Sequence, residues 1–452
     1  MGIPIGPPVS HRRRVTRRQF LQAAGGGAAG LAGILAAGRP PAYAQTREMT
    51  FLTVASFVPD TDKELKRQFE EWGAQNKVKV RLDIIAHLQL ATKKAAEVQS
   101  RSGHDLTALG SGLGDGDLYF DQLVDLDDIA REIGDRNGGW LNESDYIFRG
   151  KWKLLPWRHA PFPMAYRTDI LEKLGEPVPD TWEDWLRVGK KAKAIGHPLG
   201  IAISHTNDAN TTLLSIMWGY GASPVAKDGK TLTINSPQTL QALEFVKRLY
   251  LEAMEPEVLA WDDASNNRCL NAGKCFAIHN PISAYESAKS GKVKLPGGQR
   301  EIHEVIDHAN TPRGPVARKT TSGFWCVGIW NFSKHVDLAK DFLKYHFAPE
   351  QQHKWIEAGR GFNSSVLANQ SKHPVYSTNP KYRVIPEVAE ATVPPSWPGP
   401  GTAASQVTYD LYLIPDMFAQ YVTGKLTAPQ AIEWAEKELK EVYAGRRALK
   451  KS

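Results

Sequence analysis

Cysteine is scarce in this chain, with three residues in 452, Cys269, Cys275 and Cys326. A scaffold built on disulfides needs more cysteines, so a hydrophobic core must hold this fold together. The spacing of Cys269 and Cys275 fits neither a zinc knuckle nor a C-x-x-C redox motif, and it leaves open a local disulfide or two buried thiols. Cys326 lies in the apolar run 324–330 and is predicted to be a core residue.

The chain also lacks the motifs of common enzyme classes. It has no G-x-S-x-G, no H-E-x-x-H, no P-loop and no C-x-x-C. Its 13 histidines are scattered, without a short-range pair spaced like metal ligands. Asp262 and Asp263 are adjacent rather than opposed across a site, although either one, beside Trp261, is a secondary candidate for a ligand contact. We therefore predict no catalytic residue, no metal and no cofactor, and an exported enzyme is the least favoured interpretation.

Lysine and acidic residues are absent from residues 1–44, which contain six arginines. Removing these six charges from the formal +7 of the whole chain leaves about +1 for the remainder. The basic sequence pI of about 9.0 is therefore mostly a property of the N-terminal segment. The rest of the chain has no lysine and arginine cluster typical of nucleic-acid binding, so nucleic acid is excluded as a partner.

The N-terminal segment has the layout of an export signal. Arg17-Arg18 is followed by Phe20-Leu21, by a glycine- and alanine-rich run over 23–37, and by a small-x-small site at Ala42-Tyr43-Ala44. The segment resembles a twin-arginine signal, which predicts folded export through the twin-arginine translocase, cleavage after Ala44 and a periplasmic product. A membrane anchor is less favoured, because the run is short and dilute in Leu and Ile against the ~20 strongly apolar residues of a span.

The remaining chain of about 408 residues is too long for one compact core, so two lobes are expected. Apolar alternation and helical spacing predict strands over 49–56, 78–85 and 105–109, with helices over 62–76 and 88–102. Strand-helix-strand alternation implies an α/β lobe with a largely parallel sheet.

Further along the chain, three helix starts carry either a capping box or a capping residue followed by proline. They are Thr181 with Asp184, Ser236-Pro237, and Thr427 with Gln430. The patterns between them predict strands over 199–204 and 276–279 and an amphipathic helix over 237–253. The α/β pattern therefore continues into the second half of the chain.

Several short segments of the mature chain form an ordered set. They are His104-Asp105-Leu106 with 122–126, 166–171 with 179–185, Asn235-Ser236-Pro237, 271–278, 311–315, 323–329 and 339–347. In this order they resemble the family 1 extracellular solute-binding proteins of ABC importers, the group that includes maltose-binding protein. The resemblance extends from about residue 49 to residue 443, although Phe276 and Ile278 depart from the family's usual residues.

The resemblance implies an α/β protein with the two-lobe, type II periplasmic binding protein fold and a ligand cleft between the lobes. One lobe would comprise residues 45–155 and 313–348, and the other 156–312 and 349–446, followed by a tail over 447–452. The implied partners are a small polar solute, a carbohydrate or polyol, and the permease subunits of an ABC importer, with lobe closure as the signal. We expect a monomer. A binding protein for a non-sugar solute and a sensory adaptor are the alternatives.

A pyranose has an apolar face and a rim of hydroxyls, so its binding site needs aromatic platforms and polar side chains. The candidates lie in the loops where the family places its cleft. They are Phe57, Ser111, Gly112, Trp157, Arg158, His205, Asn207, Tyr285, Trp325, Trp397, Tyr409 and Tyr412. Trp157 could instead be a packed hinge residue, and Asn210 could cap the helix that follows His205. Ile282 stands where relatives often carry a tryptophan platform.

Overall fold

The computed structural model describes residues 47–110, 113–295, 297–298 and 300–447. The predicted export signal, the candidate site residues Ser111 and Gly112, and residues 448–452 of the predicted tail lie outside the described residues. By its internal contacts the chain separates into residues 1–47 and a second compact unit, Glu48–Ser452, which carries the fold.

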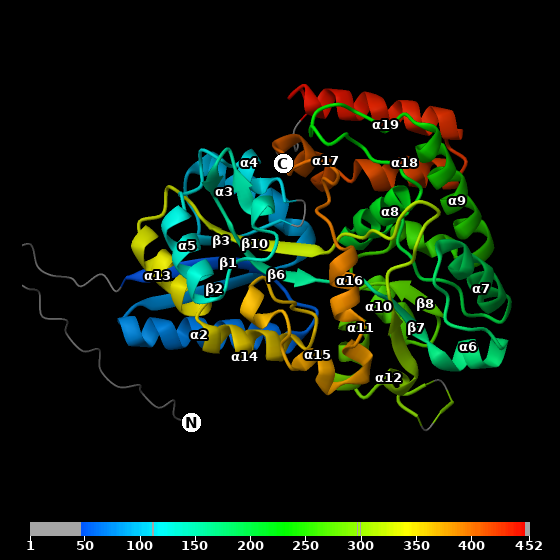
Figure 1. The fold of residues 1–452 in the computed structure, drawn as a ribbon, viewed down its shortest axis with the longest axis horizontal. Coiled ribbons are helices and arrows are strands. Elements are labelled where there is room, and N and C mark those ends of the chain that lie inside the picture. The colour runs from blue at the N-terminus through cyan, green and yellow to red at the C-terminus, as the bar shows by residue number, and fades with distance from the viewer. Residues whose placement is uncertain (1–46, 111–112, 296, 299, 448–452) are drawn as a thin grey trace, which may run out of the picture. The chain divides into compact units, whose positions relative to one another are not determined.

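The first lobe is built on a five-stranded sheet with the strand order β2-β1-β3-β10-β6 (Figure 1). Its strands are β1 (Glu48–Val54), β2 (Lys79–Ile85), β3 (Leu106–Leu109), β6 (Leu155–Ala160) and β10 (Gly323–Ile329). Strand β1 runs parallel to β2 and β3, as predicted for the first three strands. Strand β10 is antiparallel to both β3 and β6. The sheet is therefore mixed, and β10 comes from a segment far later in the chain than its neighbours.

Helix α2 (Pro59–Asn76) shows how the local sequence builds this lobe. Leu65, Phe69 and Trp72 recur at helical spacing and are all buried. The Phe69 ring meets the Phe51 ring of β1 edge-on, with centroids 6.2 Å apart. Proline at the start and acidic side chains in the first turn favour the helix beginning where it does. The predicted helix is confirmed, with its start three residues earlier.

Helices cover both faces of the first sheet. Helices α13 (Val336–His346) and α14 (Pro349–Gly359) pack against α2. Figure 1 shows α3 (Leu90–Ser100) and α4 (Asp115–Leu118) on the opposite side. All four residues of β3 are buried, as expected for a strand covered on both faces.

The second lobe contains a three-stranded antiparallel sheet with the order β8-β7-β9. Its strands are β7 (Met164–Arg167), β8 (Ala277–His279) and β9 (Ile306–Ala309). The strand predicted over 276–279 is confirmed, whereas the one predicted over 199–204 is wrong. That apolar segment is buried, but its amides donate to three separate carbonyls, those of Ala253, Ala277 and Val258. No single neighbouring strand pairs with it, so it forms only isolated bridges.

The predicted helix caps are confirmed in the second lobe. Thr181 and Thr427 form capping boxes at α7 (Trp182–Ala194) and α19 (Ala428–Tyr443). Ser236 accepts a hydrogen bond from the Thr239 amide at the start of α9 (Pro237–Ala253).

Helix α8 (Asn207–Gly219) is capped by Thr206, which accepts from the Ala209 amide 3.0 Å away. The alternative in which Asn210 caps this helix is therefore wrong. The Asn210 side chain instead donates to the carbonyl of Tyr409, 3.1 Å away. This bond joins α8 to a helix close to the C-terminus.

The remaining elements connect and enclose the two sheets. The strands are β4 (Ile147–Phe148) and β5 (Lys151–Trp152), and the helices are α5 (Asp127–Arg136), α6 (Thr168–Leu174), α10 (Ser265–Asn271), α11 (Ser283–Ser290), α12 (Ile302–Val305), α15 (Val375–Thr378), α16 (Ile385–Ala391), α17 (Ala403–Asp410) and α18 (Leu413–Val422). The short 3-10 helices of the described residues are η1 (His87–Gln89), η2 (Glu143–Tyr146), η3 (Pro256–Ala260), η4 (Ala368–Gln370) and η5 (Pro380–Tyr382).

The chain passes repeatedly between the sheets, so each lobe is built from discontinuous sequence. Strand β6 keeps the chain in the first sheet as far as Ala160, and β10 returns it there at Gly323. Helix α14 also packs on the first lobe, through α2. The exact lobe limits stay a prediction, but these elements lie with the first sheet.

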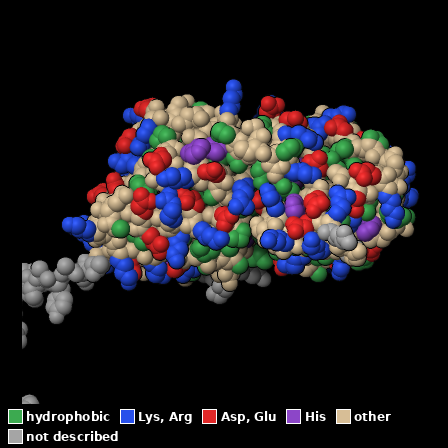
Figure 2. All heavy atoms as spheres, turned by 90° about the horizontal axis from the view of Figure 1, so that it is seen from below, with side chains coloured by type: hydrophobic (Ala, Val, Ile, Leu, Met, Phe, Trp, Pro, Cys, Tyr) green, Lys and Arg blue, Asp and Glu red, His purple; other side chains and the backbone are tan. Residues whose placement is uncertain are grey.

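Cys269 and Cys275 form a disulfide, which resolves the alternative left open by their spacing. It ties the end of α10 to the segment that leads into β8. Cys326 is a buried free cysteine, as predicted. Within the described ranges, no helix is both long enough and apolar enough to cross a membrane. Figure 2 shows lysine and arginine side chains interspersed with aspartate and glutamate over one face.

Candidate ligand-binding cleft

A small cavity lies between the two lobes, with side chains from both in its lining. The lining residues are Phe57, His87, Ala160, Phe162, Trp325 and Phe362, facing Asn207, Asp208, Asp263, Asn280, Pro281 and Ser283. Its volume of about 30 Å³ matches the share of one water molecule in the liquid. The cleft is therefore closed in this structure, and a sugar-sized solute would enter only after the lobes separate.

The first wall of the cleft, formed by Phe57, His87, Trp325 and Phe362, is aromatic. Phe57 follows β1 and His87 follows β2, so both stand at the carboxyl edge of parallel strands. The His87 ring lies 4.7 Å from the Trp325 ring and 5.3 Å from the Phe57 ring, between centroids. The Phe362 ring meets Phe57 at 6.4 Å. These rings offer apolar contact area to a solute.

His87 also connects the two walls. Its Nε2 lies 2.9 Å from the Ala55 carbonyl, which can only accept, so Nε2 carries the proton. Nδ1 then accepts from the side-chain amide of Asn207 in the second lobe, 3.3 Å away. Burial, together with the charge of Arg158, lowers the pKa of His87 to about 4. The ring is therefore neutral at neutral pH, as these two bonds require.

Arg158 lies next to the first wall and is 1% exposed. Its guanidinium carbon is 5.6 Å from the ring centroid of Trp325 and 5.9 Å from that of Phe362. Among the residues that the structure describes, its Nε and Nη2 have no hydrogen-bond partner. Burial lowers the pKa of Arg158 to about 10, which leaves the side chain charged at neutral pH.

The second wall, formed by Asn207, Asp208, Asp263, Asn280 and Ser283, is polar. The amide of Asn207 donates to Asp263 Oδ1, 2.8 Å away, at the start of α8. Burial and the charge of Asp263 raise the pKa of Asp208 well above its ordinary value. Burial also raises the pKa of Asp263, to about 6. These carboxyl and amide groups can accept and donate hydrogen bonds to hydroxyls.

A network behind the second wall fixes its side chains. Asn280 donates to Asn267 Oδ1 at 2.6 Å and to Ser283 Oγ at 3.1 Å. Asn266 donates to Asp208 and to Asn280 Oδ1. Asn266 and Asn267 come from α10, the helix that the disulfide holds at its end. The second wall is therefore supported from α8, α10 and the loop after β8.

The lobes also meet where α17 packs on α4. The Gly114 amide donates to Gln406 Oε1 at 2.9 Å, and the buried Lys94 pairs with Asp115. Asp410 lies near this pair, and burial raises its pKa to about 7. Asp115 Oδ1 and Asp410 Oδ2 have no hydrogen-bond partner within the described part of the chain. Unpartnered polar groups thus occur in this second contact between the lobes as well.

Three of the predicted site residues, Phe57, Asn207 and Trp325, line the cavity together, and Arg158 lies beside them. Trp157 is instead a core residue, as in the packed alternative. It stacks on Trp355 at 5.4 Å, and its Nε1 donates to His346 Nε2 at 2.9 Å.

The other predicted site residues lie outside the cavity lining. The Tyr285 hydroxyl accepts from Asn379 at 2.8 Å. Trp397 packs edge-on against Trp218, with centroids 5.8 Å apart. Tyr409 is buried, with a hydroxyl that has no partner among the described residues. His205 and Tyr412 stack on each other at 4.9 Å. The structure does not bring these five residues together with Phe57 and Trp325.

Several lining residues are not among the predicted site residues. His87, Phe162, Phe362, Asp208, Asn280 and Ser283 are the principal ones. His87 had a usable signal, because it follows the second parallel strand just as Phe57 follows the first. Asp263, a secondary candidate, does line the cavity.

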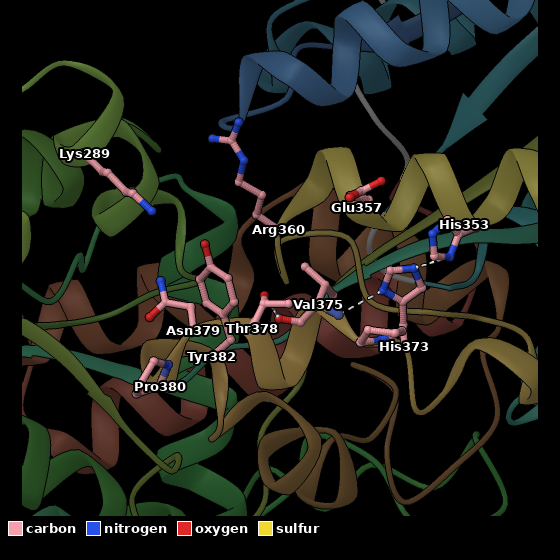
Figure 3. A pocket seen from close by; sticks show the side chains of 11 residues that line it. Lys289, His353, Glu357, Arg360, His373, Val375, Thr378, Asn379, Pro380 and Tyr382 are labelled. Carbon is pink, nitrogen blue, oxygen red and sulfur yellow. Dashed lines mark hydrogen bonds between the residues drawn. The ribbon is translucent and has the colours of Figure 1, made fainter.

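A larger cavity of about 700 Å³ lies beside α14, α15 and η5 (Figure 3). His373 Nδ1 accepts from the Val375 amide, and His373 Nε2 lies 2.8 Å from His353 Nδ1. Arg360 donates to Glu286 at 3.1 Å and to Asp60 at 2.6 Å. These polar groups bond to protein partners, and no group of three or more metal-ligating side chains occurs in the described ranges. We favour the smaller cavity because it has an aromatic wall from one lobe and a polar wall from the other, with the unpartnered Nε and Nη2 of Arg158 beside it.

Two α/β lobes that both line a closed cavity define a two-lobe solute-binding protein. Residues 58–353 match the family described as bacterial extracellular solute-binding protein. The chain belongs to this family.

Two curated relatives share part of the sequence. The "Probable ABC transporter-binding protein" of Deinococcus radiodurans is 24% identical over 292 residues, 62% of this chain and 66% of the relative. The "Arabinooligosaccharide-binding protein" of Bacillus subtilis is 24% identical over 246 residues, 48% of this chain and 51% of the relative. The matches thus span between half and two-thirds of these relatives.

Solved structures resemble the fold over most of the chain. A maltose-bound protein of T. maritima has a TM-score of 0.71 and 21% identity, covering 87% of this chain and 99% of its own. A sugar transporter protein of Arthrobacter chlorophenolicus with bound laminaribiose has a TM-score of 0.74 and 17% identity, with the same coverage of both chains. A ribitol complex from Agrobacterium radiobacter has a TM-score of 0.70 and 16% identity, covering 88% of this chain and 98% of its own. These similarities establish the two-lobe fold.

Proposed function

We propose that this protein binds a carbohydrate between its lobes and delivers it to an ABC importer. The curated relatives carry the names of an ABC transporter-binding protein and an arabinooligosaccharide-binding protein. Structures of similar fold hold maltose, laminaribiose and ribitol. Family and fold are those of binding proteins, so we propose a binding function rather than an enzymatic one.

The observation that carries the proposal is the contrast between the two walls of one closed cavity. Phe57 and Trp325 supply aromatic surface that suits the apolar face of a sugar ring. Asp208, Asp263 and Asn280 supply oxygens and an amide that suit its hydroxyls. A solute that is apolar on its faces and polar around its rim satisfies both walls at once.

Lobe closure would then be the signal that the importer reads. The cavity of about 30 Å³ is too small for a sugar, so the solute must bind an opened form or hold the lobes slightly apart. The hydrogen bonds from Asn207 to His87 and from Gly114 to Gln406 would break and reform in this motion. A solute that contacts both walls stabilises the closed arrangement because it binds that arrangement more tightly.

The same proposal includes the cellular context. The protein would be exported by the twin-arginine translocase, lose its signal after Ala44, and act as a monomer outside the cytoplasm. Its partner would be a permease pair in the inner membrane. The N-terminal arginine pair and the family's extracellular location support this part.

Isothermal titration calorimetry on the purified full chain tests the binding function. The solutes are maltose, laminaribiose, an arabino-oligosaccharide and ribitol, with an amino-acid mixture for contrast. We expect at least one carbohydrate to bind, and Trp325→Ala to weaken it by about 2 kcal/mol, roughly 30-fold in Kd. Trp434→Ala, on α19 away from the cavity, is the matched control and should leave affinity unchanged. Binding of an amino acid with no response to any carbohydrate would refute the proposal.

A further inference from the structure

Arg158 is a buried cation without an anion. Its side chain is 1% exposed, and no ion pair or hydrogen bond to it occurs among the described residues. The carboxylate of Asp62 interacts with Arg158 electrostatically, but its two oxygens already accept from the Ser56 amide at 2.9 and 3.2 Å. The rings of Trp157, Trp325 and Phe362 offset part of this charge, but no anion is hydrogen-bonded to it among the described residues. A buried charge without such an anion is costly, so a group from outside the chain is expected to complete this site.

The unpartnered atoms of Arg158, Nε and Nη2, share one edge of the guanidinium. Three other arginines of this protein use the same pair of nitrogens on both oxygens of a carboxylate. They are Arg67 on Glu64 at 2.8 and 2.6 Å, Arg167 on Asp169 at 3.0 and 2.5 Å, and Arg446 on Glu441 at 2.9 and 2.7 Å. The two parallel N–H groups on this edge match a carboxylate. In Arg158 the same two nitrogens have no hydrogen-bond partner among the residues that the structure describes.

The place of Arg158 in the fold brings its guanidinium next to the solute site. Arg158 and Ala160 are two residues apart on β6, so their side chains share one face of the strand. Ala160 lines the cavity, as do Trp325 and Phe362, whose rings lie within 6 Å of the guanidinium carbon. The charge of Arg158 also acts on His87 in the same wall. A solute group that packs against Trp325 is therefore close enough to interact electrostatically with the Arg158 guanidinium.

We propose that the solute carries a carboxylate, which Arg158 binds through Nε and Nη2, so that the substrate class is an acidic carbohydrate of the uronic-acid type. This inference rests on the proposed carbohydrate-binding function and narrows it. The two walls would orient such a solute, with its carboxylate toward Arg158 and its hydroxyls toward Asp263 and Asn280. A phosphate shares the negative charge but not the flat, two-oxygen shape that one arginine edge fits.

Calorimetry with matched solutes tests the assignment on the purified full chain. The probes are galacturonate and digalacturonate, their neutral counterparts galactose and galactobiose, and galactose 6-phosphate. We expect the carboxylated sugars to bind at least ~10-fold more tightly than the neutral ones. Arg158→Met should weaken the carboxylated sugars roughly 100-fold and hardly change the neutral ones. Arg158→Lys should fall between, because an ammonium cannot form the two parallel bonds.

A second measurement separates this role from a structural one. If Arg158 binds the solute and does not stabilise the fold, Arg158→Met should keep or raise the melting temperature of the ligand-free protein, because a buried unpaired charge is removed. Arg248→Met, at an exposed pair with Glu183, is the control for general charge loss. A large fall in the melting temperature of Arg158→Met would overturn the proposal and indicate a structural cation.

The outcomes distinguish this inference from the function on which it rests. Neutral sugars that bind as tightly as acidic ones would overturn the inference and leave carbohydrate binding standing. Tight binding of the sugar phosphate alone would overturn the carboxylate assignment in favour of phosphate. If no carbohydrate binds, both proposals fail.

Discussion

The two walls of the cleft satisfy their polar groups in different ways. In the second lobe, Asn266, Asn267, Asn280 and Ser283 bond to one another, so this wall is complete without a solute. In the first lobe, Nε and Nη2 of Arg158 have no hydrogen-bond partner within the described residues, and aromatic rings face the cavity. A wall whose side chains are already fixed loses little conformational entropy when a solute binds. A wall with unpartnered polar atoms favours a solute that can bond to those atoms over one that cannot. We therefore expect the second lobe to bind the hydroxyls of many sugars and the first lobe to select among solutes.

Removing the centre of the second wall should have the largest effect. Asn280→Ala leaves Asn267 Oδ1 and a side-chain N–H of Asn266 without their bonds to Asn280. We expect a loss of about 3 kcal/mol in the free energy of unfolding, together with weaker binding of any carbohydrate, because buried polar groups are left unsatisfied. Urea unfolding and calorimetry measure the two effects.

Asn271→Ala is the matched control for this variant. Asn271 lies at the end of α10, the helix that carries Asn266 and Asn267, and its side chain donates to Ser287 Oγ at 2.9 Å, outside the cavity. It should cost about 1 kcal/mol and leave affinity unchanged. Equal losses in the two variants would contradict a special role for the Asn280 network.

A smaller effect should appear in the pH dependence of the second wall. Burial raises the pKa of Asp263 from its ordinary value of 3.8 to about 6 in the folded state. Between these pH values the folded chain holds a proton that the unfolded chain has released, so stability falls as pH rises from 3.8 to about 6. In Asp263→Asn the free energy of unfolding should decrease by on the order of 1–2 kcal/mol less than in the wild type over this pH range. Calorimetric melting between pH 3.8 and about 6 measures the difference.

The neighbouring acid supplies a control of opposite sign. Hydrogen bonding to Ser265 lowers the pKa of Asp262, so its ionised form stabilises the fold and this contribution is lost as pH falls. Asp262→Asn should therefore lose stability toward neutral pH rather than gain it. Asp410, with its pKa raised to about 7, titrates in all three chains and cancels in the comparison. Parallel melting curves for wild type and Asp263→Asn would show that Asp263 is not perturbed by the second wall.

The smallest effect is expected at a residue outside both walls. His205 pairs with Asp416 at 2.7 Å on the surface and stacks on Tyr412. His205→Ala should change the free energy of unfolding by less than about 0.5 kcal/mol, as is typical of exposed pairs, and leave carbohydrate affinity unchanged. A clear loss of carbohydrate affinity in His205→Ala would contradict this expectation and show that the binding site extends beyond the cavity to His205.

Local patterns were sufficient for elements that bury one clear face. Strand β1 and helices α2 and α9 were predicted because their apolar residues repeat at the period of the element. The segment 199–204 has a similar apolar content, but its hydrogen bonds go to three different segments. Such partners are set by tertiary packing, which the local sequence does not show.

The site could be predicted only in part, for the same reason. Phe57 and Asn207 were found because they stand at the end of a strand and the start of a helix. Trp157 and Tyr285 were predicted as aromatic residues in the loops where the family places its cleft, but Trp157 packs against Trp355 and the Tyr285 hydroxyl bonds to Asn379, both outside the cavity lining. Phe362 had no local signal, since the contact with Phe57 that places it comes from the distant start of the chain.

The position of β10 has a consequence for how the protein is made. Cys326 pairs with Leu109 and Val327 with Leu155, so β10 fills the gap between β3 and β6. Both neighbours leave the ribosome long before it does, and until then each presents an unpaired edge. Pairing across such sequence separation is slow, and open strand edges invite association between chains. A nascent chain that stops before Gly323 cannot complete its first lobe, so synthesis itself delays the fold until most of the chain exists.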